Sequence, residues 1–365
     1  MESHNTENSK VMRGGLFAAS NSSSGFKSYY QEIFNKKEYN KIYVIKGGPG
    51  TGKSRFMNMV ADFASGQGYS VERYYCSSDP DSLDAIIIAK SVVLLDGTPP
   101  HTYDGSLVGA REELIDLGGF WRSEALSEKI DEIEDLVNKK SLCYKSAYKY
   151  LEACGAVDAV SAKLIEGAIK QAKMESAIER LLSVFSSDGC CDVAPAITDS
   201  IGMKGRVKFD TFEKSAEKLY YIIDVSGSAR LYLSLLISKA KEKNIGMKVS
   251  YDPILPQYPD GVYFYNKNAA FVIVEKEDAE RDDAVKINMQ RFVDHNVLSE
   301  IKKKLKGNQK LYDGLCASAA QSLVEAGEYH FELERIYSSC MDFLAKERFT
   351  ASFCIKLADY LHRRL

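Results

Sequence analysis

Eight consecutive residues near the start of the chain have the types and spacing to hold a phosphate group. In this stretch, GGPGTGKS (47–54), glycines allow successive backbone N–H groups to turn toward one anion. Lys53 can reach the terminal phosphates of a nucleotide, and the Ser54 hydroxyl can ligate Mg²⁺. We therefore expect ATP or GTP, with Mg²⁺, to be bound by Gly47, Gly48, Pro49, Gly50, Thr51, Gly52, Lys53, Ser54 and Arg55.

A loop of this kind needs a strand before it and a helix after it. Residues 41–45, KIYVI, form a β-branched and aromatic run that predicts a buried strand. Residues 53–65 have apolar side chains at helical spacing, and the N-terminal end of such a helix attracts an anion. Residues 91–96, SVVLLD, predict a second buried strand that ends in Asp96. Residues 16–26 are small and polar, so we expect a loop there.

These stretches resemble those of a known superfamily. Residues 41–57 resemble the Walker A segment of P-loop nucleoside triphosphatases, and residues 91–96 resemble their Walker B strand. The resemblance implies that Asp96 holds Mg²⁺ opposite Ser54, and that Lys53 and Asp96 take part in catalysis. The phrases GLFAASNSSSGF and VVLLDGTPPH further resemble a bacterial family of tandem-duplicated P-loop ATPases, for which no reaction is established.

One residue differs from the pattern of many P-loop nucleoside triphosphatases that hydrolyse their nucleotide. They follow the Walker B Asp with a Glu that activates water, whereas Gly97 follows Asp96 here. His101, in GTPPH, is the best substitute because histidine can act as a base, although a solvated loop histidine is the alternative. Weaker candidates are the acids Asp79, Asp81, Asp104 and Glu112, and the arginines Arg73, Arg111 and Arg122, which alone are typical of surface ion pairs.

The phosphate-loop region has a second, altered copy later in the chain. Residues 19–67 align with residues 196–244 without a gap, and the predicted strand and helix coincide. At the loop itself, Gly47 becomes Asp224, Gly52 becomes Ala229, Lys53 becomes Arg230 and Ser54 becomes Leu231. Unless the resemblance arose by chance, the second copy keeps the fold and has lost the phosphate and metal ligands.

The repeat predicts an α/β protein with two tandem P-loop-like domains, each a mostly parallel sheet flanked by helices. Residues 1–189 would be the intact nucleotide-binding domain, with a helical arm over residues 123–185. Residues 190–365 would be the degenerate domain, with a helical arm over residues 292–365. The first arm predicts a helical hairpin or small bundle. We expect the two domains to pack as an intramolecular pseudo-dimer.

Composition narrows the classes of partner. The net charge of −3 makes nucleic acid an unlikely partner, and no apolar run approaches the roughly 20 residues that cross a membrane. The polar N-terminal stretch lacks the apolar centre of a secretory signal, so we expect a cytoplasmic protein. The eight cysteines include no CxxC pair and no Cys/His cluster with zinc spacing, which predicts buried thiols in a reducing compartment.

The leading hypothesis is Mg²⁺-dependent ATP binding and hydrolysis in the first domain, with a catalytically silent second domain that packs against it or regulates it. A kinase acting on a small molecule or nucleotide is one alternative. A non-enzymatic, nucleotide-dependent module that holds a protein partner through the helical arms is another. The guanine-specific tetrapeptide [NT]KxD is absent, which favours ATP over GTP.

Overall fold

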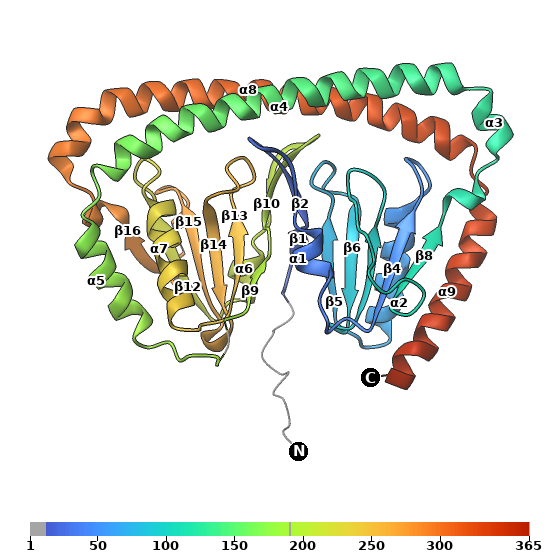
Figure 1. Ribbon diagram of the computed structural model, residues 1–365, viewed down its shortest axis with the longest axis horizontal. Coiled ribbons are helices and arrows are strands. Elements are labelled where there is room, and N and C mark those ends of the chain that lie inside the picture. Colours follow the sequence, from blue (N-terminus) through green and yellow to red (C-terminus); the bar gives the residue numbers. More distant parts are fainter. Residues whose placement is uncertain (1–11, 190, 280, 365) are drawn as a thin grey trace.

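The computed structural model describes residues 12–189, 191–279 and 281–364, and it contains two six-stranded sheets beneath a pair of long helices (Figure 1). Residues 1–10, the polar stretch that lacks the apolar centre of a secretory signal, lie outside the described residues. Cys190, the predicted first residue of the second domain, also lies outside them. No described helix is long and apolar enough to span a bilayer.

The first sheet confirms the predicted α/β architecture. Its strand order is β1-β5-β6-β7-β4-β8, and every strand except β6 runs in the same direction. The side chains of residues 42–45 in β4 alternate between two apolar layers, so this part of the strand is apolar on both faces. The strands are β1 (Gly15–Phe17), β4 (Lys41–Lys46), β5 (Val71–Tyr75), β6 (Leu83–Ile88), β7 (Val92–Asp96) and β8 (Glu112–Asp116).

The second sheet repeats this topology strand for strand. Its order, β9-β13-β14-β15-β12-β16, matches the first sheet, with β14 as the antiparallel strand. Strand β4 is followed by helix α2 (Lys53–Gly66), and the corresponding strand β12 is followed by helix α7 (Ala229–Glu242). The second-sheet strands are β9 (Val193–Pro195), β12 (Lys218–Ile223), β13 (Met247–Tyr251), β14 (Pro259–Phe264), β15 (Ala269–Val274) and β16 (Val285–Asn288).

The predicted loop over residues 16–26 is wrong, because this segment forms the end of β1 and a hairpin. The side chains of Ser20, Asn21 and Ser22 are buried where the two halves meet, and the Asn21 amide donates to the Ile201 carbonyl at 2.7 Å. Backbone pairing and such bonds satisfy the polar groups of Asn21 and Ser22, while the Ser20 hydroxyl has no hydrogen-bond partner among the described residues. The hairpin strands are β2 (Ala19–Ser22) and β3 (Gly25–Ser28), and their counterparts are β10 (Asp199–Gly202) and β11 (Gly205–Lys208).

The gap-free alignment of the repeat is also wrong before β4. The turn glycines with positive φ are Gly25 and Gly205, so Gly25 corresponds to Gly205 and not to Gly202. A longer connection follows α1 (Tyr30–Phe34) than follows α6 (Thr211–Ser215), and this difference shifts the register. At β4 and β12 the alignment matches the structure. Helix α2 begins at Lys53 and is followed by a turn at Gly68, whereas α7 begins at Ala229 and is followed by a turn at Asn244. The second loop is therefore one residue shorter, and Ala229, not Arg230, corresponds to Lys53.

The two helical arms pair with each other. The antiparallel helices α4 (Ile130–Glu166) and α8 (His295–Ser339) run across both sheets (Figure 1). The Sγ atoms of Cys154 and Cys316 lie 3.4 Å apart between them. The first arm is therefore not a hairpin within itself. The remaining short elements are α3 (Ser123–Ser127), η1 (Gly118–Phe120), η2 (Tyr265–Lys267) and η3 (Met289–Phe292).

Each arm ends in a helix that covers the sheet of the other half. Helix α9 (Phe343–Arg364) places Phe353, Leu357 and Leu361 in the apolar layer of α2 and the first sheet. Helix α5 (Gln171–Leu182) makes the corresponding contacts with α7 and the second sheet. A third apolar layer, which includes the stacked rings of Phe17 and Phe209 at 4.8 Å, joins the two sheets. The halves are thus interlocked as an intramolecular pair.

Leu357→Ala in α9 should lower the free energy of unfolding of the full chain by about 2–5 kcal/mol, because it leaves a cavity in the first domain. The matched control is Ile355→Ala, since Ile355 is 65% exposed and Leu357 is 1% exposed. The control should change stability by at most about 0.5 kcal/mol. Chemical denaturation measures both. Equal stabilities of the two variants would contradict the assignment of α9 to this core.

Candidate functional site

The loop between β4 and α2 has the backbone form of a phosphate cradle. Gly50 and Gly52 have φ angles of 68° and 75°, a region that side chains disfavour. Helix α2 begins at Lys53, directly after Gly52. The Lys53 ammonium folds back over the loop and donates to the carbonyls of Gly47 at 2.7 Å and Gly48 at 3.1 Å. The chain therefore presents a helix N-terminus and a lysine at one point.

The predicted metal ligands lie beside this loop. Strands β4 and β7 are neighbours, and Ile45 pairs with Asp96, so both strands end at the same edge. The Asp96 carboxylate lies 3.5 Å from the Lys53 ammonium and accepts the backbone N–H of Thr98 at 2.8 Å. The Ser54 hydroxyl accepts the backbone N–H of Leu83 at 2.9 Å. Ser54 and Asp96 line the same cavity.

A cavity of about 580 Å³ covers the loop, and ligand pockets of roughly 300–1,000 Å³ are typical. The phosphate loop forms its floor, and the segments 76–84 and 98–101 line its sides. Its roof comes from α4 and α8, and Met203 of the second half also lines it. The roof residues are Lys140, Ser141, Tyr144 and Tyr148 from α4, and His330 and Glu334 from α8.

The roof adds polar groups that the sequence did not reveal. Tyr144 donates to the Ser78 hydroxyl at 3.1 Å, which ties α4 to the wall of the cavity. Burial, together with the nearby Lys140 cation, lowers the pKa of His330 to about 4, so this imidazole is neutral at pH 7. Burial also lowers the pKa of Lys140. These residues are far from the loop in sequence, and only the pairing of α4 with α8 places them above it.

The phosphate loop packs directly on the second half. A Cβ on Gly50 would lie 2.5 Å from the Glu334 carbonyl oxygen and 2.9 Å from the Ser338 backbone nitrogen, both in α8. A Cβ on Gly52 would lie 2.6 Å from the ammonium of Lys346, a fully buried residue of α9 whose pKa is lowered by burial and by Arg55. The glycines therefore also permit close helix contact.

Of the other residues predicted from the sequence, some line the cavity and others lie outside it. Arg55 points to solvent and pairs with Glu347 of α9 at 3.1 Å, and it does not line the cavity. Asp79 lines the cavity and pairs with Lys204 of the second half at 3.1 Å. The remaining weaker candidates do not line the cavity. Three ion pairs account for most of them: Asp81 with Lys204, Arg73 with Asp62, and Arg111 with Glu112. Arg122 donates to the Ser339 carbonyl, and Asp104 is exposed.

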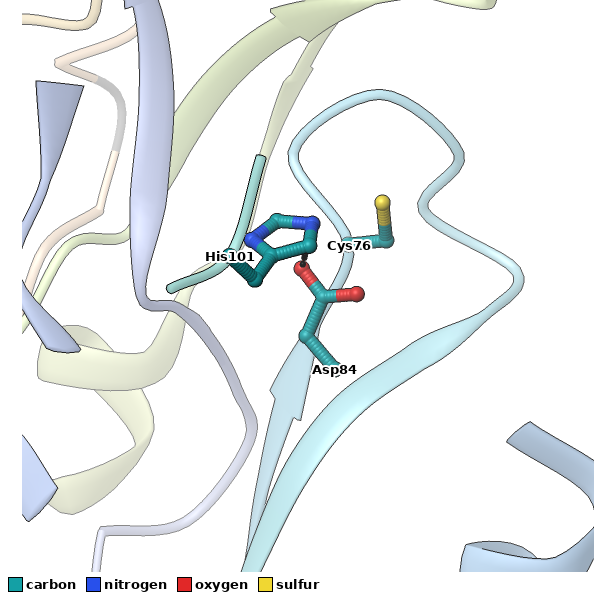
Figure 2. Close-up of side chains that lie close together, drawn as sticks. All are labelled: Cys76, Asp84 and His101. Carbon is teal, nitrogen blue, oxygen red and sulfur yellow. Dashed lines mark ion pairs between the residues drawn. The ribbon is translucent and has the colours of Figure 1, made fainter. Parts of the chain in front are cut away.

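His101 belongs to a buried cluster on the cavity wall. Its ring packs against Phe26 and Tyr30, with centroids 5.3 and 5.2 Å away. Its Nε2 atom lies 3.3 Å from Asp84 Oδ2, and Cys76 lies beside both side chains (Figure 2). Burial raises the pKa of Asp84 to about 6, and the neighbouring His101 opposes that rise. An acid inside the apolar run of β6 was the signal that could have drawn attention to Asp84.

The corresponding loop of the second half is filled by its own side chain. The Asp224 carboxylate accepts the backbone N–H groups of Gly227 at 2.6 Å and Ala229 at 2.7 Å. Arg230 turns away to Asp158 of α4 at 2.6 Å and stacks on the Tyr258 ring. The position of a phosphate oxygen is thus taken by a carboxylate.

The second half also lacks an acid at the end of β15. Ile222 of β12 pairs with Ile273, whereas Ile45 of β4 pairs with Asp96. The apolar run AFVIVE (270–275) ends in Glu275 as SVVLLD ends in Asp96, but the strand register places Ile273, two residues earlier, opposite Asp96. A partly buried isoleucine therefore stands where the first half has its candidate metal ligand.

Gly50→Ala should destabilise the full chain more than Gly227→Ala. Both glycines have positive φ, so each substitution should cost about 1–2 kcal/mol of backbone strain. Only Gly50 packs against a helix backbone, since a Cβ on Gly227 would meet the Arg230 side chain at 3.6 Å. The clash should add about 1–3 kcal/mol. Chemical denaturation measures the difference, and equal losses would contradict the packing of the loop on α8.

Comparisons with known proteins found no match to this chain. No family model matches the chain. No curated protein and no solved structure matches it either. The arguments for function therefore come from the loop, the cavity above it and the contrast between the two halves.

Proposed function

We propose that the first half binds a nucleoside triphosphate with Mg²⁺ and hydrolyses it slowly, while the second half is catalytically silent. The bound phosphates would occupy the floor of the cavity, against the backbone N–H groups of the loop and the start of α2. ATP is the favoured nucleotide, because the sequence has no guanine-specific tetrapeptide. The two-domain resemblance to duplicated P-loop ATPases agrees with this proposal.

The observation that carries the proposal is the occupied loop of the second half. There, two backbone N–H groups hold the anionic oxygens of Asp224 at 2.6 and 2.7 Å. Gly227 corresponds to Gly50, and Ala229, the first residue of α7, corresponds to Lys53, the first residue of α2, while Gly47 stands in place of Asp224. Because glycine supplies no internal anion, the backbone N–H groups of the first loop are left to bind an external one.

The side chains around the loop fit a magnesium nucleotide. Lys53 can exchange its contacts with the Gly47 and Gly48 carbonyls for phosphate oxygens. Ser54 and Asp96 offer a hydroxyl and a carboxylate on the same cavity, which are ligands that Mg²⁺ accepts. Bound Mg²⁺ would neutralise charge on the phosphates. In the proposed reaction Lys53 and Asp96 orient these groups, and His101, held by Asp84, orients the attacking water and accepts its proton.

The second half supports the loops that would respond to the nucleotide. The Ser200 hydroxyl donates to the Ser77 carbonyl at 2.9 Å, and the Met203 N–H donates to the Ser78 carbonyl at 2.7 Å. Segment 76–84 is therefore attached to the β10–β11 hairpin, while the phosphate loop touches α8 and α9. A change around the terminal phosphate would reach the helical arms through these contacts.

Two other functions use the same loop. A kinase would transfer the terminal phosphoryl group to a second substrate, and the absence of a Glu after Asp96 suits that alternative. A non-enzymatic module would bind the nucleotide and use the arms to hold a partner. Incubation with γ-labelled ATP or GTP and a metabolite pool separates the three, through free phosphate, a labelled metabolite or tight binding alone.

Lys53→Ala should abolish nucleotide binding and phosphate release, because it removes the cation that faces the phosphates. The matched control is Arg230→Ala in the first turn of α7, which the sequence alignment placed opposite Lys53 and which should leave both unchanged. Equilibrium dialysis with γ-labelled ATP and Mg²⁺ measures binding, and released label measures turnover. Unchanged binding by the Lys53 variant, or equal loss in the control, would contradict the site.

His101→Gln should lower phosphate release by about 10²–10⁴-fold while nucleotide binding persists, because the glutamine cannot take a proton. His362→Gln in α9 is the control, since His362 is exposed and lies outside the cavity lining. Single-turnover release of labelled phosphate measures the step. Normal release by the His101 variant would remove His101 from the proposed reaction.

A further inference from the structure

We infer that Cys76, Asp84 and His101 form a binding site for Zn²⁺ or a similar first-row transition metal. The three residues come from the end of β5, from β6 and from the loop after β7, and their side chains gather at one place (Figure 2). One ligand atom from each, a thiol sulfur, a carboxylate oxygen and an imidazole nitrogen, can be chosen so that all lie within 4.8 Å of one another. The inference goes beyond the proposed function and does not depend on a nucleotide.

The separations suit a small tetrahedral ion. Zinc bonds of about 2.0–2.3 Å place neighbouring ligand atoms of a tetrahedron roughly 3.3–3.8 Å apart. The Asp84 Oδ2 and His101 Nε2 atoms are already 3.3 Å apart. The remaining separations, at most 4.8 Å, need about 1 Å of closure, which rotation of the Cys76 side chain can supply.

The burial of the polar atoms also points to an ion. Asp84 is 3% exposed and His101 is 7% exposed. Among the described residues, His101 Nδ1 has no hydrogen-bond partner, and Asp84 Oδ2 makes no hydrogen bond although it lies 3.3 Å from His101 Nε2. Each such buried atom costs about 1–3 kcal/mol, and a bound cation would remove the cost at the carboxylate. Contacts with Phe26 and Tyr30 hold the imidazole in place beforehand.

The donor set selects the kind of metal. Thiolate and imidazole ligands favour zinc and related ions, whereas Mg²⁺ prefers oxygen ligands such as those of Ser54 and Asp96. Three protein ligands leave the fourth tetrahedral position for water, as in catalytic zinc sites. All three residues line the cavity over the phosphate loop, so that position faces the cavity.

The second half contains a natural comparison. By strand register, Asp260 of β14 corresponds to Asp84 and is likewise buried without a hydrogen-bond partner among the described residues. Asp252 corresponds to Cys76 and pairs with Arg206 at 3.4 Å. The loop after β15 has no histidine in its sequence, KEDAE. A buried aspartate alone therefore recurs, while the soft ligands occur only in the first half.

Metal binding would change the role of His101. An imidazole whose reacting nitrogen is bound to a metal cannot accept a proton there, so the metal-bound water would be the polar group directed at the cavity. That water would face the cavity that Lys53 and Asp96 also line. None of the three ligands belongs to residues 47–54, so metal binding would use no residue of the phosphate loop.

The first test is Co²⁺ titration of the full, chelator-treated chain without nucleotide. Wild-type protein should develop a thiolate-to-cobalt charge-transfer band and the visible bands of tetrahedral Co²⁺, and it should bind Zn²⁺ in competition. Cys76→Ser, Asp84→Asn and His101→Gln should each weaken Zn²⁺ binding by about 100-fold or more. The controls Asp260→Asn and Cys143→Ser should bind Zn²⁺ as tightly as the wild type. Lys53→Ala should also bind Zn²⁺ normally, so that failure of the proposed nucleotide site can be distinguished from failure of the metal site.

The second test needs no variant and so is independent of any folding defect. X-ray absorption of the zinc-loaded wild-type chain should show one sulfur at about 2.3 Å, with nitrogen and oxygen ligands at about 2.0–2.2 Å. A shell with no sulfur, or with two or more, would overturn the proposal. Absence of stoichiometric zinc binding by the wild type would overturn it too, as would unchanged affinity in the three ligand variants.

Discussion

The exchange of terminal helices between the halves is the constraint on which the rest of the structure depends. One apolar face of each sheet is covered only in part by its own half, through α2 or α7, and α9 or α5 of the other half completes the cover. To reach that position, each arm must cross the molecule, and the two crossing helices α4 and α8 pair along their length. The core of either domain, and the roof over the phosphate loop, are therefore products of both halves.

The contrast between the two loops is the main support for the proposed site. Both follow a buried strand and precede a helix, and in the second loop two backbone N–H groups donate to Asp224. Asp224 satisfies those groups from within, so the second loop is closed without a ligand. Gly47 supplies nothing, and the first loop is instead surrounded by the chain: α8 against Gly50, Lys346 against Gly52, and the buried His101 cluster on the cavity wall.

The sequence predicts features whose determinants are local. The strand, loop and helix over residues 41–66 could be recognised because glycine, lysine and serine stand at fixed spacing between apolar runs. The duplication was visible for the same reason, yet its register failed before β4, where a connection changes length. Contacts between distant segments had no sequence signal. The polar hairpin at residues 19–28, the roof residue Lys140, and the meeting of Cys76 with Asp84 and His101 all depend on which elements become neighbours.

The interlocked arms also limit how such a chain can change over generations. A substitution within the second loop alters only a site that its own aspartate already fills, whereas a substitution along α8 or α9 disturbs the floor and roof of the first site. Selection acting on the first loop would therefore fall on helices encoded in the second half. The silent half would drift where its own loop lies and stay constrained where it serves its neighbour, so that neither half could be deleted without losing both.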